Sequence, residues 1–458
     1  MRQRRIAILV AVVVVAGVII AVLGRSGETP GPRRLAPGAG TTDSTRDPFA
    51  YDAGRRADFE ARAAAGLSHV LYAKSPDGVV ATAKRVQALR PTVEDVAKRA
   101  KQDPDTLEAI VFLESGGRPD VAASNDLNSA VGLTQILAQT ATGLLGLKVD
   151  VRASTRLTGQ IGRAQNFRHI AKLKARRRRV DERFDPRKAL EATTRYLEFA
   201  KGRLHDRDDL AVESYHMGVG NLQRALKAYG NEDIPYAQLF FDSTPIRHAA
   251  AWRILASLGD DSSTYLWRIG AAKAIMKLYR DGEGGPDLDA QDALQDWPSA
   301  EHVLRPPQST PAFTDDGAIQ GQDLVLLSTL DGLRLSRALQ QAPERNRTLR
   351  EPAARLLSYL ATAVRTTAQT APLVATALTR SVKSEGEARV GDGVEGAPST
   401  HTTGYAFDLS RNYTSPAQAQ ALQFWLDRLT ALNDIAWVRE PDVIHVTVGP
   451  RAKDLATR

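Results

Sequence analysis

Apolar residues follow three different patterns along the chain, and each pattern predicts a different structure. An unbroken apolar run of eighteen residues, Ile6 to Leu23, is just long enough to span a bilayer. From about Pro91 to Asp281 the apolar residues recur at helical spacing. From about Gln322 to Pro450 helical patterns mix with short β-type runs, at Ala436 to Val438 and Val443 to Val448. We therefore predict a multidomain chain: an N-terminal transmembrane helix, an all-α domain, then an α+β domain with a small antiparallel sheet.

Two stretches rich in glycine and proline separate these regions. The stretch from Gly24 to Pro48 has few large apolar groups and reads as a flexible spacer, and an alanine-rich helical pattern follows it. A second spacer begins at Gly282. We expect this division of the chain: 1–24, cytoplasmic tip and transmembrane anchor; 25–89, spacer and helical stalk; 90–281, all-α domain; 282–321, linker; 322–458, α+β domain.

The basic residues before the apolar run predict the orientation of the anchor. Met-Arg-Gln-Arg-Arg should stay in the cytoplasm, which makes this a single-pass protein of the cell membrane with both domains outside the cytoplasm. Cleavage after Gly24 is the alternative, but the long apolar core favours an uncleaved anchor. The chain has no cysteine, which excludes disulfides and thiolate metal sites and suits an extracytoplasmic location.

The net charge favours an anionic partner. It is +8, with an isoelectric point near 9.6, and leaves nucleic acid, membrane lipid and cell-wall polymer open. The basic run from Lys172 to Arg179 has no interleaved aromatic residues. We therefore interpret it as a solvated helix face or an insertion loop, with wall or membrane anions as its targets, and expect no nucleic-acid binding.

A carboxylate on a buried helix face is the first candidate for chemistry. Asp103-Pro104 predicts a helix start, and Leu107, Ile110 and Val111 form an apolar face that includes Glu114. Burial raises the pKa of a carboxyl group, as a general acid working near neutral pH requires. The alternative is a structural ion pair between Glu114 and Arg118.

Three ordered motifs place this glutamate in a family. Glu-Ser-Gly-Gly-Arg-Pro-Asp begins at Glu114, Ala-Val-Gly-Leu-Thr-Gln-Ile at Ala130, and Ser-Tyr-His-Met-Gly-Val-Gly-Asn at Ser214. Together they resemble the soluble lytic transglycosylase domain, which implies a lysozyme-like helical fold over about 180 residues. Thr134 and His216-Met217 depart from the family pattern and put the substrate preference in doubt.

The resemblance implies roles for four residues and a substrate. Glu114 would be the catalytic acid/base, and Ser115, Gln135 and Tyr215 would shape a cleft for a peptidoglycan strand. A single carboxyl group is sufficient and no cofactor is needed. Glu114 protonates the glycosidic oxygen and then takes a proton from the muramyl 6-hydroxyl, so that an anhydro ring closes. Ordinary glycosidases, in contrast, pair two carboxyl groups.

A second site is indicated near the C-terminus. In Ser-Thr-His-Thr-Thr-Gly-Tyr-Ala-Phe-Asp, His401 and Asp408 are seven residues apart, and His445 follows inside the apolar run Val-Ile-His-Val. Two histidines and a carboxylate are a ligand set of catalytic zinc sites, which keep a fourth position open for water. The chain has only eight histidines, which gives the pattern weight.

This pattern resembles the D-alanyl-D-alanine carboxypeptidase and L-alanyl-D-glutamate endopeptidase family. The resemblance implies that His401, Asp408 and His445 bind Zn²⁺, which polarises a peptide carbonyl and activates water. Asp442, three residues before the second histidine, would be the general base, with Glu440 as the alternative. A turn at Pro441 must then bring Asp442 toward the histidine face. The family's substrate-positioning arginine would be Arg380, which could equally be a surface charge. A domain that has lost the metal and only binds the wall is the alternative.

Both resemblances point to one polymer. We therefore predict a membrane-anchored, bifunctional peptidoglycan hydrolase that cleaves the MurNAc–GlcNAc bond and the stem peptides. The alternatives are a hydrolytic muramidase, a non-enzymatic wall-binding scaffold of a secretion or division complex, and a nucleic-acid-binding membrane protein that uses the arginine run. The choice between carboxypeptidase and endopeptidase, protein partners and oligomeric state stay open.

Overall fold

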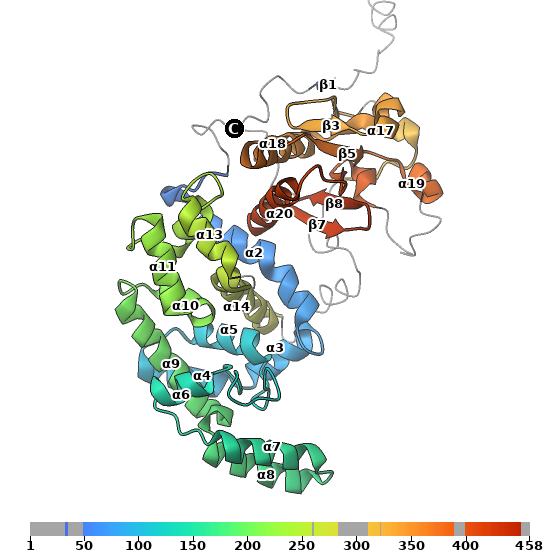
Figure 1. Cartoon of the computed structure of the whole chain (residues 1–458). Coiled ribbons are helices and arrows are strands. Elements are labelled where there is room, and N and C mark those ends of the chain that lie inside the picture. Colours follow the sequence, from blue (N-terminus) through green and yellow to red (C-terminus); the bar gives the residue numbers. More distant parts are fainter. Residues whose placement is uncertain are drawn as a thin grey trace, which may run out of the picture.

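The computed structural model describes residues 33–34, 49–258, 261–282, 310–320, 322–388 and 399–449 (Figure 1). The predicted anchor, Ile6 to Leu23, lies outside these residues, as does most of the predicted linker. Within the described part of the chain, every helix is too short or too polar to cross a membrane. Anchoring therefore stays a prediction.

The first domain is built from helices, as predicted. Its helices are α3 (Val79–Gln87), α4 (Arg90–Ala100), α5 (Pro104–Ser115), α6 (Ala138–Gly143), α7 (Val151–Arg163), α8 (Phe167–Val180), α9 (Pro186–Arg203), α10 (Asp208–Met217), α11 (Val219–Tyr229), α12 (Tyr236–Asp242), α13 (Ala249–Ser257) and α14 (Tyr265–Asp281). Two short 3-10 turns, Glu182–Phe184 and Asp261–Thr264, lie between these helices, and a third, Ala53–Arg55, directly precedes the helix that begins at Arg56.

Local capping determines the ends of α5, the helix that carries Glu114. The Asp103 side chain accepts the Asp105 N–H at 3.0 Å, and Pro104 occupies the first helical position. The helix ends at Gly116, whose φ of +57° is left-handed and favours glycine. The start and end predicted from the sequence are confirmed.

The second domain is α+β, with helices packed on a sheet. Its strands are β2 (Val325–Leu326), β3 (Leu333–Leu335), β4 (Thr348–Leu349), β5 (Leu373–Ala377), β6 (Ala406–Ser410), β7 (Ile435–Arg439) and β8 (Val443–Val448). Its helices are α16 (Asp316–Ile319), α17 (Arg337–Gln341), α18 (Glu351–Ala368), α19 (Val382–Ala388) and α20 (Pro416–Ala431), with 3-10 turns at Glu344–Arg347 and Thr400–Thr403.

The main sheet has the strand order β3-β5-β6-β8-β7. Strand β5 pairs with β6, β6 with β8 and β8 with β7, and all three pairs are antiparallel. Strands β3 and β5, in contrast, pair in parallel. The prediction of an antiparallel sheet is therefore wrong at this edge, because α18 crosses over between the two strands and returns the chain in the same direction. The predicted strands at 436–438 and 443–448 are confirmed.

Segments expected to be spacers also contact this domain. β1 (Arg33–Arg34) pairs with β2, which in turn pairs with β4. Phe313, in the expected linker, is 3% exposed, and its N–H donates to the Thr402 carbonyl at 2.7 Å. The end of the linker thus packs against the segment that carries His401.

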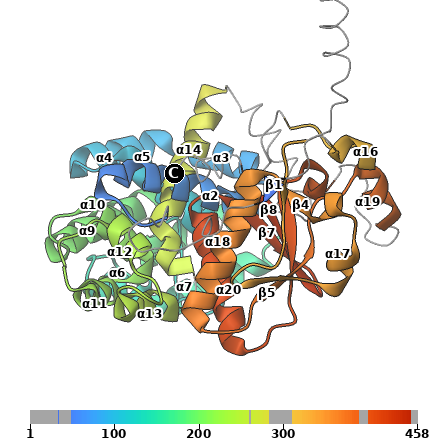
Figure 2. The same cartoon turned by 90° about the horizontal axis from the view of Figure 1, so that it is seen from above.

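The helix expected as a stalk, α2 (Arg56–Lys74), packs between the two domains. It contacts α14 on one side and α20 on the other, and both views show α20 on the side of the sheet that faces the helical domain (Figures 1 and 2). Arg62 of α2 donates to both carboxylate oxygens of Asp434, at 2.7 and 2.6 Å. Their side chains are 7% and 1% exposed, so this ion pair is buried.

An arginine of the α+β domain reaches back into the helical domain. The Arg428 guanidinium donates to the carbonyls of Phe240 and Ser243, at 2.6 and 2.9 Å, and lies over the Phe240 ring. One continuous hydrophobic core includes residues of both domains, among them Phe59, Phe241, Trp425 and Leu429. The two domains are therefore joined by a buried interface.

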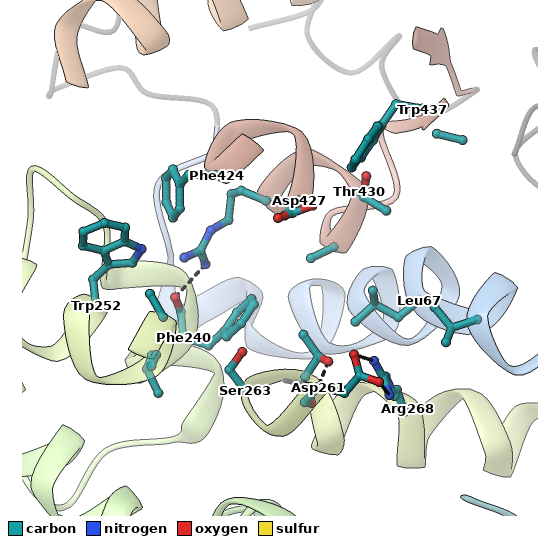
Figure 3. A pocket seen from close by; sticks show the side chains of 17 residues that line it. Leu67, Phe240, Trp252, Asp261, Ser263, Arg268, Phe424, Asp427, Thr430 and Trp437 are labelled. Atoms are coloured by element: carbon teal, nitrogen blue, oxygen red, sulfur yellow. Dashed lines mark hydrogen bonds and ion pairs between the residues drawn. The ribbon is translucent and has the colours of Figure 1, made fainter. Parts of the chain in front are cut away.

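A cavity of about 460 Å³ lies at this interface (Figure 3). Rings from both domains line it: Phe240 and Trp252 from the helical domain, Phe424 and Trp437 from the α+β domain. The ion pair between Asp261 and Arg268 forms part of its floor. Its lining residues do not include Glu114, His401, Asp408 or His445.

Candidate active sites

The Glu114 carboxylate lies at the end of α5, in contact with the start of α14. The Tyr265 hydroxyl donates to Glu114 Oε1 at 2.7 Å. Glu114 is half-buried, and burial raises its pKa to about 7, although the hydrogen bond from Tyr265 partly opposes this shift. Arg118, the alternative partner considered from the sequence, instead donates to the Ser115 carbonyl at 3.0 Å. The carboxyl group can therefore exchange a proton near neutral pH.

Aromatic rings connect the three sequence motifs. Tyr215 stacks on Tyr265, with ring centroids 6.2 Å apart, and its hydroxyl donates to the Thr134 carbonyl at 2.8 Å. Burial raises the pKa of Tyr215 far above its ordinary value, so the hydroxyl remains a neutral donor. The Tyr265 ring also stacks on His216, whose Nδ1 lies 2.8 Å from the Ser262 hydroxyl. The fold thus places the second and third motifs beside Glu114.

Two further predicted cleft residues make mainly local contacts. The Ser115 hydroxyl is buried and donates to the Val111 carbonyl at 3.2 Å, one turn back in its own helix. The Gln135 amide donates to the Gly132 carbonyl at 2.8 Å. Gly132 has φ of +82°, and a Cβ there would lie 1.9 Å from the Arg183 carbonyl, so this turn requires glycine. The roles of Ser115 and Gln135 in binding stay predictions.

A second buried carboxyl group lies close to this site. Glu213, on α10, is fully buried, and burial raises its pKa to about 8. Its Oε2 accepts the Leu266 N–H at 2.8 Å. That N–H belongs to the first turn of α14, next to Tyr265, so Glu213 caps the helix that presents the tyrosine to Glu114.

The predicted metal ligands lie together on the sheet of the second domain. Asp408 of β6 pairs directly with His445 of β8, and His401 belongs to the 3-10 turn before β6. Asp408 Oδ1 lies 3.1 Å from His401 Nε2 and 2.7 Å from His445 Nδ1. One ligand atom from each residue falls within 4.8 Å of the other two, and all three residues are buried. The donor set and its clustering fit a zinc ion.

Hydrogen bonds around the cluster orient the imidazoles. His401 Nδ1 lies 2.6 Å from the Leu378 carbonyl, so this nitrogen carries the proton and Nε2 is left for a metal. His445 Nε2 faces the hydroxyls of Thr400 and Thr447, at 3.4 and 3.3 Å. Burial raises the pKa of Asp408, but the two imidazoles outweigh it and hold the pKa well below its ordinary range.

Both candidates for the general base lie in the hairpin turn between β7 and β8. The predicted turn at Pro441 is present: the Glu440 N–H donates to the Val443 carbonyl at 3.0 Å. Glu440 and Asp442 are both exposed. Arg411 donates to the Pro441 carbonyl at 2.7 Å and supports the turn. The choice between the two acids stays a prediction.

Arg380 lies next to the cluster through its backbone. Its N–H donates to the His401 carbonyl at 3.3 Å, and its guanidinium pairs with the buried carboxylate of Glu385 at 3.2 Å. The Arg380 side chain is 33% exposed, so its contact with a substrate stays a prediction beside the surface-charge alternative.

Comparison with known families bears on the first site. Residues 91–237 match the family model described as Transglycosylase SLT domain. The chain thus contains an SLT transglycosylase domain, with a lysozyme-like all-α fold, and this domain implies peptidoglycan as the substrate and suggests lytic transglycosylase activity. The match ends at residue 237 and does not extend to the α+β domain. No curated protein matches the chain.

Sequence reasoning missed Tyr265 and Glu213. Tyr265 is 151 residues from Glu114 and lies beyond the matched segment. Glu213 lies two residues before Tyr215, on the apolar side of α10 between buried Leu210 and Met217. Its position on that apolar face is the signal that could have identified it, by the same argument that identified Glu114.

Proposed function

We propose that this protein is a membrane-anchored, bifunctional peptidoglycan hydrolase. It would cut the glycan strand at the MurNAc–GlcNAc bond with Glu114 and the stem peptides with a zinc site in its second domain. The observation that carries the proposal is the Glu114 carboxyl group, whose pKa is raised to about 7, inside an SLT transglycosylase domain.

In the proposed glycan reaction Glu114 acts first as an acid and then as a base. The protonated carboxyl group gives its proton to the glycosidic oxygen as the bond to the muramyl C1 breaks. The resulting carboxylate accepts the proton of the muramyl 6-hydroxyl, whose oxygen closes on C1. The products are an anhydromuramyl end and a free 4-hydroxyl, and Glu114 is protonated again. No water is consumed.

The surroundings of Glu114 favour this reaction over hydrolysis. The Glu114 carboxylate accepts a hydrogen bond from the Tyr265 hydroxyl, which is not an acid that could hold a water for hydrolysis. A hydrolytic muramidase usually uses a second carboxyl group to hold water or to bind the sugar. Glu213, a second buried carboxyl group, directs one oxygen to the Leu266 N–H at the start of α14.

In the proposed peptidase reaction the α+β domain binds a stem peptide over the cluster. His401, Asp408 and His445 would hold Zn²⁺, which supplies Lewis-acid polarisation of the peptide carbonyl and activation of water. Asp442, or alternatively Glu440, would accept the proton of the attacking water, and Arg380 would orient a substrate carboxylate or carbonyl. Whether the cut removes a terminal residue or opens an internal bond is left to experiment.

The N-terminal apolar run would anchor the protein in the cell membrane with both domains outside the cytoplasm. A single chain would then carry two activities to the wall. The buried interface between the domains supports this proposal, because it would hold the two sites at a constant separation.

Digestion of purified peptidoglycan by the full chain tests both halves. We expect anhydromuramyl products by mass spectrometry that are lost in Glu114→Gln, and peptide cuts that are lost with a chelator and in His401→Ala. Asp442→Asn should slow the peptide cuts far more than Glu440→Gln. Reducing muramyl ends would indicate hydrolysis instead. Absence of all turnover in the wild type would indicate a scaffold, and peptide cuts that survive both chelation and His401→Ala would refute the zinc site.

A further inference from the structure

The hairpin of α7 and α8 carries the basic character of the whole protein. Residues 151–180 contain ten lysines and arginines and no aspartate or glutamate. The net charge of the entire chain is only +8, so the rest of the chain is slightly acidic. The hairpin, which we call the basic arm, projects from the helical domain at the end opposite the α+β domain (Figure 1).

The base of the arm is firmly held. Asp120 pairs with Lys174 at 2.7 Å and with Arg177 at 2.5 Å. The Arg177 guanidinium is 3% exposed and lies over the Phe184 ring, 3.7 Å from its centroid. At the other side of the base the Asp150 N–H donates to the Val180 carbonyl at 2.7 Å. Two of the ten cations therefore anchor the arm, and its direction is fixed by the domain.

Most of the remaining cations form two exposed stripes, one on each helix. The stripe on α7 is Arg152, Arg156 and Arg163, and that on α8 is Arg168, Lys172, Arg176 and Arg179. With 3.6 residues per turn, the members of each stripe lie on one side of their helix, opposite its buried residues. Those buried residues are Ser154 and Leu157 on α7, and Leu173 and Arg177 on α8.

The two stripes face away from each other. The Arg177 guanidinium donates to the Thr158 hydroxyl at 3.1 Å, which shows that the buried sides of the helices meet inside the hairpin. The stripes therefore lie on its two outer sides. A flat bilayer can meet one such side at a time, whereas a flexible polymer chain can contact both.

We propose that the basic arm binds phosphodiester polymers of the cell wall, and so holds the protein on its substrate. This inference rests on the proposed function for the choice of a wall partner. Six of the seven stripe residues are arginines, whose planar guanidinium groups match phosphate oxygens with paired hydrogen bonds. The chemistry of the arm is thus complementary to a polyanion and contributes no catalytic group.

Sedimentation with purified walls tests the proposal. Intact walls are compared with walls whose phosphodiester polymers have been removed by cold hydrofluoric acid. Every sample carries Glu114→Gln and His401→Ala, so that neither glycan cleavage nor peptide cleavage can degrade the walls. We expect binding to fall by about tenfold on stripping, and by a similar factor between low and high salt.

Three variants assign the binding to the arm. Two variants replace three stripe cations each by glutamine, and both should bind intact walls more weakly. One changes the α7 stripe (Arg152, Arg156 and Arg163), and the other changes three residues of the α8 stripe (Arg168, Lys172 and Arg176). A control variant removes three positive charges outside the basic arm and should bind as the unmodified arm does. It replaces the exposed residues Lys84, Lys98 and Lys227 by glutamine. Circular dichroism confirms that each variant is folded.

Two outcomes would overturn the proposal. Equal binding to intact and stripped walls would exclude a phosphodiester polymer. A membrane would be the target if only one of the two stripe variants lost binding and the protein also sedimented with phosphatidylglycerol vesicles. Phe167, at the tip of the basic arm, is 87% exposed, so Phe167→Ala should then abolish sedimentation with the vesicles. Neither readout uses turnover, so failure of the arm is distinguishable from failure of the proposed activity.

Discussion

The hydroxyl of Tyr265 donates a hydrogen bond to the carboxylate of Glu114, 151 residues earlier in the chain, at 2.7 Å. The contact joins the first residue of α14 to the last turn of α5. Burial and this hydrogen bond act on the pKa of Glu114 in opposite directions, and burial is the larger effect. The pair therefore sets the pH range in which Glu114 can donate a proton.

Tyr265→Phe should move the pH dependence of glycan cleavage upward. Glu114, with a pKa of about 7, is protonated below that pH, so activity should fall as the pH rises through it. Loss of a hydrogen bond to the charged carboxylate costs about 1.5 kcal/mol and should shift this fall by about one pH unit. The measurement is the rate of anhydromuramyl release against pH. Tyr279→Phe, on the same helix, is the control, and an unshifted profile in Tyr265→Phe would contradict the assignment.

Glu213→Gln should stabilise the protein at alkaline pH. The pKa of Glu213 is about 8 in the folded state, against 4.5 for an ordinary glutamate, so the folded state keeps a proton that the unfolded chain has lost. The wild type should therefore lose stability as the pH rises between these two values, and glutamine, which does not ionise, removes this loss. The gain above pH 8 should be on the order of 5 kcal/mol, because the two pKa values differ by about 3.5 units.

Urea unfolding of this variant and the wild type at acidic and alkaline pH gives the measurement. Glutamine can still accept the Leu266 N–H, so the cap on α14 is kept. Glu198→Gln removes an exposed carboxylate and serves as the control. A stability difference that does not grow with pH would show that Glu213 is ionised in the folded protein.

The cluster of His401, Asp408 and His445 should bind one zinc ion per chain. His401→Ala or Asp408→Ala should weaken zinc affinity by more than about a hundredfold, beyond the loss expected for a supporting hydrogen-bond partner. Elemental analysis after dialysis measures the stoichiometry. Zinc should also raise the melting temperature of the wild type but not of the variants. The control is His169→Ala, at an exposed histidine of the basic arm, which should bind as much zinc as the wild type. If His401→Ala also bound as much zinc as the wild type, the proposed site would be refuted.

Arg62→Ala should destabilise the interface between the domains. It leaves Asp434, 1% exposed, without the guanidinium that binds both of its oxygens. Removing one partner of a buried ion pair lowers the free energy of unfolding by about 3–5 kcal/mol. The double variant, which also carries Asp434→Ala, should recover part of this lost stability. Urea unfolding of the two single variants and the double variant gives the coupling energy. Arg253→Ala, exposed on α13, is the control, and additive effects would exclude the pairing.

Local sequence signals determined the secondary structure and the chemistry of single residues. The Asp103 cap, the following proline and the glycines after Ser115 set the bounds of α5, because capping depends on neighbouring residues only. Short β-type runs likewise predicted β7 and β8, and Pro441 predicted the turn between them. The spacing of His401, Asp408 and His445 identified a ligand set whose side chains the sheet does bring together.

Tertiary structure alone decided which distant groups meet. Tyr265 carried no local signature of its role, because the residue it contacts lies on a helix that is remote in the chain. Glu213 could be noticed from its place on an apolar helix face, but its partner on α14 could not. Three other features could not be predicted from the sequence either. They are the parallel pairing of β3 with β5, the burial of α2 between the domains and the ion pair between Arg62 and Asp434. The sequence by itself thus determined the elements and the candidate ligands. Their long-range partners depend on how apolar faces pack together, and this packing is a property of the whole fold.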